Sequence, residues 1–178
     1  VQNLYNQGMM ISEQIVSCVD AAGALDTDYT KMQSYTSNVI HEPSEQTIGG
    51  YSDALDQAYG RMVKNIEVFK KYANASKEKE TVLDLHEKLK GMYHYQQAQM
   101  QNAVYGTEIP EEVLAAESGY NTGILSDISE LEKMIQADEK EAKAALKQAK
   151  ILSNIVIAGS IAFTVLIFII VVLISVRL

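Results

Sequence analysis

A run of apolar residues near the C-terminus constrains this chain more than any other feature. Residues 155–176 read IVIAGSIAFTVLIFIIVVLISV, with no charge and only Ser160, Thr164 and Ser175 as polar members. At about 1.5 Å per residue, a helix of this length covers roughly 33 Å, enough to cross a hydrocarbon core of about 30 Å. The run is apolar all round, whereas a helix on a soluble domain is striped. We therefore predict a transmembrane helix from Ile155 to Val176 in a lipid bilayer.

The rest of the chain is polar and periodic, and its composition favours helices. Only two prolines, Pro43 and Pro110, occur in 178 residues, and the formal net charge is −8. So little proline favours an all-α fold, and the excess of acidic residues leaves no basic face for phosphate groups. We therefore expect no nucleic-acid partner. Cys18, the only cysteine, cannot form an intrachain disulfide, and we predict that it packs in the core.

Apolar residues at alternating three- and four-residue steps predict four helices. The helices cover about 2–41, 51–73, 77–105 and 111 onward. The loops lie near 42–50, 74–76 and 106–111. The most regular stripe belongs to the first helix and contains Leu4, Gly8, Ile11, Ile15, Cys18, Ala22, Leu25, Tyr29, Met32, Thr36 and Val39. On the last helix the stripe begins at Leu114.

Short loops between long helices predict an all-α fold, an antiparallel up-down-up-down four-helix bundle. The fourth helix has no proline or turn cluster before the apolar run, so we expect it to continue into the transmembrane helix. We assign residues 1–150 to the bundle and 151–178 to the transmembrane helix and its cytoplasmic exit. In this topology the first helix starts at the level of the bilayer, so we expect another transmembrane helix before Val1.

A long first helix, two shorter helices and a long last helix that enters a membrane form a recognisable pattern. It is clearest at residues 15–20, 29–32, 128–135 and 174–178. The pattern resembles the four-helix-bundle ligand-binding domain of bacterial methyl-accepting chemotaxis proteins, the chemoreceptors. The resemblance covers nearly the whole chain and is architectural.

This resemblance implies a ligand-sensing domain in the periplasm or outside the cell, attached to the cell membrane. The chain would be single-pass as given and two-pass at full length, forming a parallel homodimer with a HAMP module and a signalling coiled coil after Leu178. A small molecule, or a binding protein loaded with one, would shift the fourth helix along its axis. Family members that bind amino acids use arginines on the first helix, but the only arginines here are Arg61 and Arg177. A pocket for aspartate or serine is therefore not expected.

Polar residues on the apolar stripe of the fourth helix indicate a candidate ligand pocket. Glu117 and Asn121 lie one turn apart, and Tyr120 is beside Asn121. The up-down topology brings them to the level of four first-helix residues, namely Tyr29, Met32, Tyr35 and Thr36, of which the first three are candidate site residues. Polar groups in a bundle core are costly unless paired. These residues therefore either line a wet pocket or face a dimer interface or solvent.

No catalytic or metal-binding motif is complete. His86 and Glu87 begin a zinc-protease pattern, but Lys90 stands where the second histidine is required. The sequence has no glycine-rich phosphate loop and no convincing pairing of a nucleophile with a base. We expect neither an enzyme nor a bound metal or cofactor.

Two alternatives share much of this architecture. The input domain of a sensor histidine kinase would have the same outer part. A tail-anchored structural or tethering protein would instead hold its bundle in the cytoplasm. Four lysines before the apolar run, against Arg177 alone after it, favour a cytoplasmic bundle by the positive-inside rule, although large domains are translocated regardless of charge. These lysines are Lys140, Lys143, Lys147 and Lys150.

Overall fold

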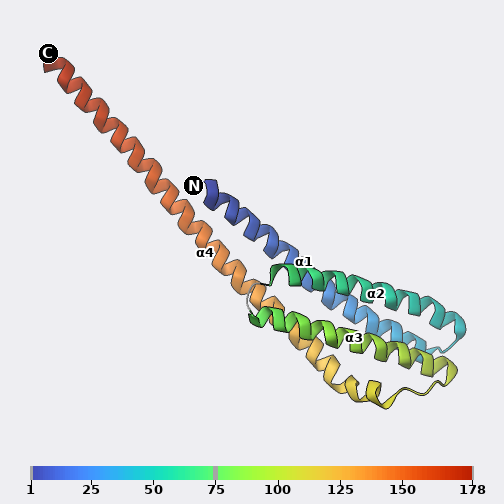
Figure 1. The fold of residues 1–178 in the computed structure, drawn as a ribbon. Coiled ribbons are helices and arrows are strands. Elements are labelled where there is room, and N and C mark those ends of the chain that lie inside the picture. The colour runs from blue at the N-terminus through green and yellow to red at the C-terminus, as the bar shows by residue number, and fades with distance from the viewer. Residues whose placement is uncertain (1, 74–75, 178) are drawn as a thin grey trace. The chain divides into compact units, whose positions relative to one another are not determined.

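The structure, a computed structural model, consists of α-helices joined by short connections. It describes the backbone of residues 2–73 and 76–177, and side-chain burial for residues 9, 12–73, 76–114 and 120–169. The helices are α1 (Gln2–His41), α2 (Glu45–Tyr72), α3 (Ser76–Tyr105) and α4 (Glu111–Arg177) (Figure 1). The described backbone contains no strand, so the prediction of an all-α fold is confirmed.

The chain divides into two compact units. Residues 14–137 form one, and residues 1–13 together with 138–178 form the other. Helix α4 belongs partly to each unit and is helical from Glu111 to Arg177. No break occurs between Ile124 and Ile155, where the sequence predicts an uninterrupted helix. The boundary predicted near residue 150 lies inside this helix.

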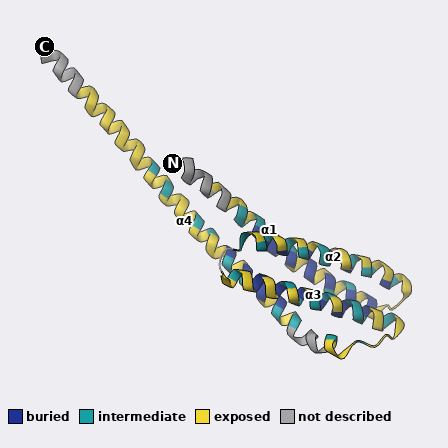
Figure 2. Cartoon of the chain, in the orientation of Figure 1, coloured by how far each residue is buried: buried dark blue, intermediate teal, exposed yellow. Residues whose placement is uncertain are grey.

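All four helices contribute apolar side chains to one core in the unit of residues 14–137. Figure 2 shows buried positions along the helices of this unit, alternating with exposed ones. The predicted stripe of α1 is buried from Cys18 to Val39, whereas Leu4, Gly8 and Ile11 lie outside the residues whose burial is described. The largest fully buried side chains are Leu25, Tyr29, Met32, Val39, Leu55, Met62, Ile66, Val82, Leu85, Leu89, Met100 and Ile124. Leu114 was also expected on the core face, but it is 46% exposed.

The start of α2 differs from the prediction of a loop over residues 42–50. Helix α2 begins at Glu45, with Ser44 as its N-cap, and the Thr47 backbone N–H donates to Ser44 Oγ at 3.0 Å. Gly49 and Gly50 are therefore helical. Each glycine costs about 1 kcal/mol relative to alanine, but the cap contributes about 1 kcal/mol and the buried Ile48 adds hydrophobic stabilisation. The predicted loop is therefore wrong from Glu45 onward.

The connection between α3 and α4 follows the sequence signals more closely. Gly106 has a φ of 65°, a left-handed conformation that glycine adopts without a steric penalty. Its N–H donates to the carbonyl of Asn102 at 2.9 Å, and the Asn102 amide donates to the carbonyl of Thr107 at 2.8 Å. Helix α4 then starts directly after Pro110.

Helices α2 and α3 lie side by side and are joined by aromatic and polar contacts (Figure 1). The rings of Tyr59 and Tyr93 stack with their centroids 4.2 Å apart, and Tyr93 donates to Asp56 at 2.8 Å. Burial and the neighbouring Asp56 carboxylate raise the pKa of Tyr93 to about 12. The phenol therefore stays protonated and keeps this hydrogen bond across the neutral pH range.

The C-terminal part of α4 has a different surface. Every residue from 155 to 169 is exposed, as Figure 2 shows. Ser160 donates to the carbonyl of Ile157 and Thr164 to that of Ser160, both at 2.8 Å, so both hydroxyls are satisfied within the helix. Within the described residues, α4 is the one helix long and apolar enough to cross a membrane. Positions 170–176 of the predicted span lie outside the residues whose burial is described.

Candidate functional site

A polar contact joins α1 to α4 where the sequence places its candidate pocket. The Tyr29 hydroxyl donates to Asn121 Oδ1 at 2.6 Å, and Gln33 Nε2 donates to the same oxygen at 3.0 Å. Tyr29 is 1% exposed, and burial raises its pKa to about 12, although the hydrogen bond with Gln33 opposes that shift. The neutral phenol therefore remains a donor. Two donors on one oxygen also fix the orientation of the Asn121 amide, because its NH₂ group must then point away from Tyr29 and Gln33.

The other predicted site residues are dispersed. Met32 is fully buried in the core, and Tyr35 is half-buried and stacks on Tyr51 with centroids 5.8 Å apart. The ring of Tyr120 lies against α3 at Gly91, where an added Cβ would come within 2.3 Å of it. The side chain of Glu117 lies outside the described residues. The structure thus brings Tyr29 and Asn121 into direct contact and places Met32, Tyr35 and Tyr120 in packing positions.

A hollow of about 340 Å³ lies beside this contact, between α1, α3 and α4. Its lining residues are Gln33, Thr36, Ser37, Ile40, His41, Met92, Tyr95, Gln96, Gln99 and Asn121. Of the five predicted site residues whose side chains the structure describes, Asn121 alone contributes to it. Most of these side chains carry hydrogen-bonding groups, and none is aspartate, glutamate, lysine or arginine. The described part of its lining is therefore polar without carrying a strong charge.

One wall of the hollow contains a buried polar atom that lacks a partner. Gln96 is 4% exposed, and its Oε1 accepts no hydrogen bond. A buried, unsatisfied amide oxygen costs about 1–3 kcal/mol, so such an atom in a native fold calls for a physical reason. The sequence places Gln96 on the otherwise apolar stripe of α3, which is the signal that could have identified it.

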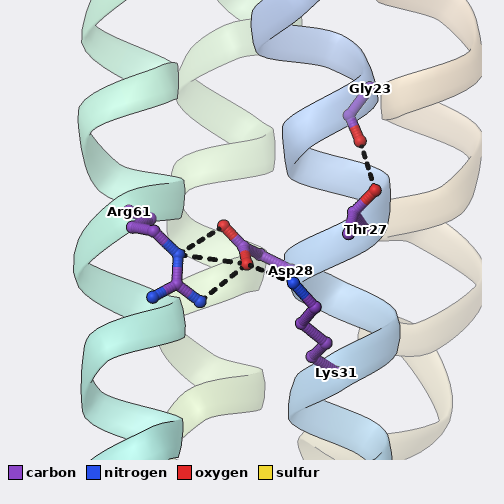
Figure 3. A network of polar contacts seen from close by, with 5 residues as sticks. All are labelled: Gly23, Thr27, Asp28, Lys31 and Arg61. Atoms are coloured by element: carbon purple, nitrogen blue, oxygen red, sulfur yellow. Dashed lines mark hydrogen bonds and ion pairs between the residues drawn. The ribbon is translucent and has the colours of Figure 1, made fainter.

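A charged contact that the sequence did not suggest joins α1 to α2 (Figure 3). Arg61 contacts both carboxylate oxygens of Asp28, its Nε at 3.0 and 3.2 Å and one terminal nitrogen at 2.8 Å. Lys31 lies 4.0 Å from the same carboxylate. The Asp28 side chain is 7% exposed and that of Arg61 46%. The hydrogen bonds with Asp28 raise the Arg61 pKa. We assign this contact a role in holding α1 against α2.

A second charged cluster joins α3 to α4. Lys88 Nζ lies 2.6 Å from Asp84 on its own helix and 2.8 Å from Asp127 on α4. Hydrogen bonds with Asp127, and then with Asp84, raise the Lys88 pKa. The lysine chain crosses α4 at Gly123, where an added Cβ would come within 2.9 Å of it. Lys77 and Glu130 form a more exposed ion pair nearby, at 2.6 Å.

The side of the α3–α4 interface near these lysines is open and charged. A hollow of about 930 Å³ is lined there by Ser76, Lys77, Lys79, Glu80, Thr81, Leu83, Asp84, Glu87, Asp127 and Glu130. Its charges of both signs are characteristic of a solvated groove. Among the described residues, no three histidine, cysteine, aspartate or glutamate side chains are arranged to hold a metal ion.

Comparison with models of known protein families, with curated protein sequences and with solved structures finds no match to this chain.

Proposed function

We propose that this chain is the ligand-sensing part of a bacterial transmembrane chemoreceptor. Residues 14–137 would form the sensor domain, and the apolar part of α4 would cross the cell membrane. Binding of a small molecule, directly or through a binding protein, would displace α4. That displacement would control a cytoplasmic signalling module, and no chemical reaction would occur in the domain itself.

The proposed topology of the sensor domain is up-down-up-down. Contacts between successive helices support it, because residue numbers that rise along one helix pair with numbers that fall along the next. The pairs are Asp28–Arg61 and Tyr35–Tyr51, then Asp56–Tyr93 and Lys70–His86, then Lys77–Glu130 and Lys88–Asp127. An antiparallel arrangement with short connections is the usual one for such bundles.

The observation that carries the proposal is the continuity of α4. This helix supplies the buried Ile124 and Ile128 to the core and, further along, the exposed apolar residues from 155 to 169. Its backbone is helical throughout, so it contains no loop that would absorb a displacement between these stretches. Residues 155–169 would be costly to leave in water, because soluble proteins rarely expose so large an apolar surface.

A small set of polar contacts would adjust the position of α4. Asn121 bonds to Tyr29 on α1, and Asp127 bonds to Lys88 on α3. Each is a short-range contact, so a shift of one or two ångströms along the axis would break or exchange it. Asn121 lines the hollow, so a ligand bound there would lie within reach of α4. The full receptor would act as a homodimer spanning the membrane twice per chain.

A second candidate is a tail-anchored tethering protein whose bundle lies in the cytoplasm. The observation that favours it is the row of exposed lysines before the apolar stretch, Lys140, Lys143, Lys147 and Lys150. Cytoplasmic flanks of membrane spans are enriched in lysine and arginine. A sensor histidine kinase remains a variant of the first proposal, because its input domain would work in the same way.

The side of the membrane on which residues 14–137 lie separates these candidates. Cells producing the full-length protein with Lys31→Cys would be treated with a membrane-impermeant maleimide before and after permeabilisation. The Lys31 side chain is 51% exposed, whereas the native Cys18 is only 8% exposed. The parent chain, which has Cys18 alone, therefore gives the background labelling. A receptor predicts equal labelling in intact and permeabilised cells. Labelling only after permeabilisation would exclude the receptor and favour the tether.

A further inference from the structure

The hollow between α1, α3 and α4 has the composition of a site for an uncharged ligand. Its lining combines amides and hydroxyls with the apolar side chains of Ile40 and Met92. Its titratable members, among the described lining residues, are His41 and Tyr95. His41 Nδ1 lies 2.8 Å from the carbonyl oxygen of Ser37. A carbonyl oxygen only accepts, so Nδ1 carries a proton, and in the neutral ring Nε2 is then an acceptor.

Gln96 supplies the feature that points to a ligand. Its Oε1 is buried without a donor, in a side chain that lines the hollow and is 96% removed from solvent. The neighbouring amide of Gln99 is already engaged, because its Nε2 donates to the Tyr95 hydroxyl at 2.6 Å. Methionine or leucine would fill the same volume without an unsatisfied oxygen. The glutamine is explained if a bound molecule donates a hydrogen bond to it after a small side-chain rotation.

The lining also limits the charge and size of such a molecule. A bound ion is stabilised by a counter-charge, and the described lining offers no carboxylate, ammonium or guanidinium group. A volume of about 340 Å³ is near the lower end of the range for small-molecule sites, roughly 300–1,000 Å³. Hydroxyl groups, which both donate and accept, match walls of mixed amides and hydroxyls.

We propose that this hollow binds a small uncharged molecule with several hydroxyl groups, such as a monosaccharide or a cyclic polyol, with Gln96 Oε1 accepting one of its hydrogen bonds. This inference rests on the proposed receptor function and names the chemical class of its ligand. Asn121 links the site to α4, because its oxygen is held by Tyr29 and Gln33 while its NH₂ group can donate elsewhere. Binding of the ligand would therefore affect α4 directly, and α4 is the helix that contains the apolar stretch.

Thermal unfolding of the full chain in lipid nanodiscs tests this proposal. The probes are D-glucose, D-ribose and myo-inositol, compared with L-aspartate, citrate and putrescine, each at millimolar concentration. A ligand that binds only the folded state raises the Tm, so we expect at least one of the three neutral probes to raise it by roughly 2 °C or more. The charged probes should leave it unchanged.

Gln96→Met then separates the hollow from other binding sites. It removes the unsatisfied oxygen and keeps the volume, so the free protein should have an unchanged or higher Tm. The rise caused by the neutral probe should disappear. Gln101→Met is the matched control, since Gln101 is exposed on the same helix and outside the lining of the hollow. That variant should retain the full response.

Three results would overturn the proposal. They are the absence of a response to all three neutral probes, a response that persists in Gln96→Met, and a Gln96-dependent response to charged probes alone. None of these affects the maleimide experiment, which depends on membrane topology and needs no ligand. The ligand class and the receptor function can therefore fail independently.

Discussion

Two stretches of α4 contain similar apolar residues in opposite surroundings. Ile124, Ile128, Leu131 and Ile135 are each at most 8% exposed, whereas Ser126, Glu132 and Lys133 between them are exposed. Further along, Ile155 is 61% exposed and every residue to position 169 is exposed as well. Residue type is therefore not what decides burial in this helix. Spacing decides it in the first stretch, where other helices cover one face. The second stretch instead exposes apolar residues on all sides, a surface that soluble proteins rarely present.

The largest expected difference between the two stretches comes from shortening one isoleucine in each. Ile124→Ala should destabilise the unit of residues 14–137 by about 2–5 kcal/mol, because it leaves a cavity in the core. Ile161→Ala should not change the unfolding of that unit. Tyrosine fluorescence during urea unfolding in detergent measures this, since every tyrosine except Tyr5 lies within residues 14–137. Equal effects of the two variants would contradict the contrast.

A charge in the second stretch tests its apolar surroundings directly. Ile161→Arg should lower membrane insertion by about 2.5–3.5 kcal/mol, the cost of arginine near the centre of a spanning helix. The unfolding of residues 14–137 should stay as in the parent chain. The measurement is the fraction of protein that remains with the membrane after carbonate extraction, with Ile161→Leu as the control. Equal retention of the arginine and leucine variants would argue that residue 161 does not lie near the centre of a spanning helix.

Within the first unit, pH tests the burial of Tyr29. Its folded-state pKa is about 12, against about 10 in an unfolded chain. Between these values the unfolded state releases a proton that the folded state keeps, so the free energy of unfolding falls as pH rises from 10 to 12. The contribution is at most about 2 kcal/mol, since solvent near the hollow reduces it. Urea unfolding at pH 8 and pH 11 should show a smaller loss for Tyr29→Phe than for the parent chain, and an equal loss would contradict this account.

The smallest expected effect distinguishes two helical glycines of the same unit. Gly91→Ala places a Cβ within 2.3–2.6 Å of the Tyr120 ring, whereas nothing lies within 4 Å of a Cβ at Gly60. Overpacking of this kind costs about 1–3 kcal/mol, and an unhindered glycine-to-alanine change in a helix stabilises by about 0.4–1 kcal/mol. We expect Tm to fall for Gly91→Ala and to rise for Gly60→Ala in thermal unfolding. Tm changes of the same sign in the two variants would show that the Tyr120 ring does not pack against Gly91.

Much of the fold could be predicted from the sequence because helix periodicity is a local signal. The stripe from Cys18 to Val39 and the bounds of α1 and α3 follow from spacing, loop residues and caps. The start of α2 was missed, since the Ser44 cap outweighs Gly49 and Gly50. Asp28 was missed because it lies one position to the side of the stripe, and its burial depends on Arg61 from another helix.

The candidate site was less predictable, since three helices form it. The contact of Tyr29 with Asn121 lies where the sequence suggests a pocket. The hollow itself extends instead toward Ser37, His41 and Gln99, away from Met32 and Tyr35. Which face of a helix adjoins an opening depends on the rotation of its neighbours. A single stripe does not encode that rotation.

Lys88 has a consequence for how easily α3 and α4 could separate. Its ammonium group touches Asp84, one turn away on its own helix, as well as Asp127 across the interface. If Asp127 moved away, the lysine would keep one negative neighbour and gain water in place of the other. The energetic cost of such a movement is thus lower than for a lysine with a single acidic partner, because that lysine would lose its only counter-charge. Such an interface would suit the displacement of α4 that the proposed receptor function requires.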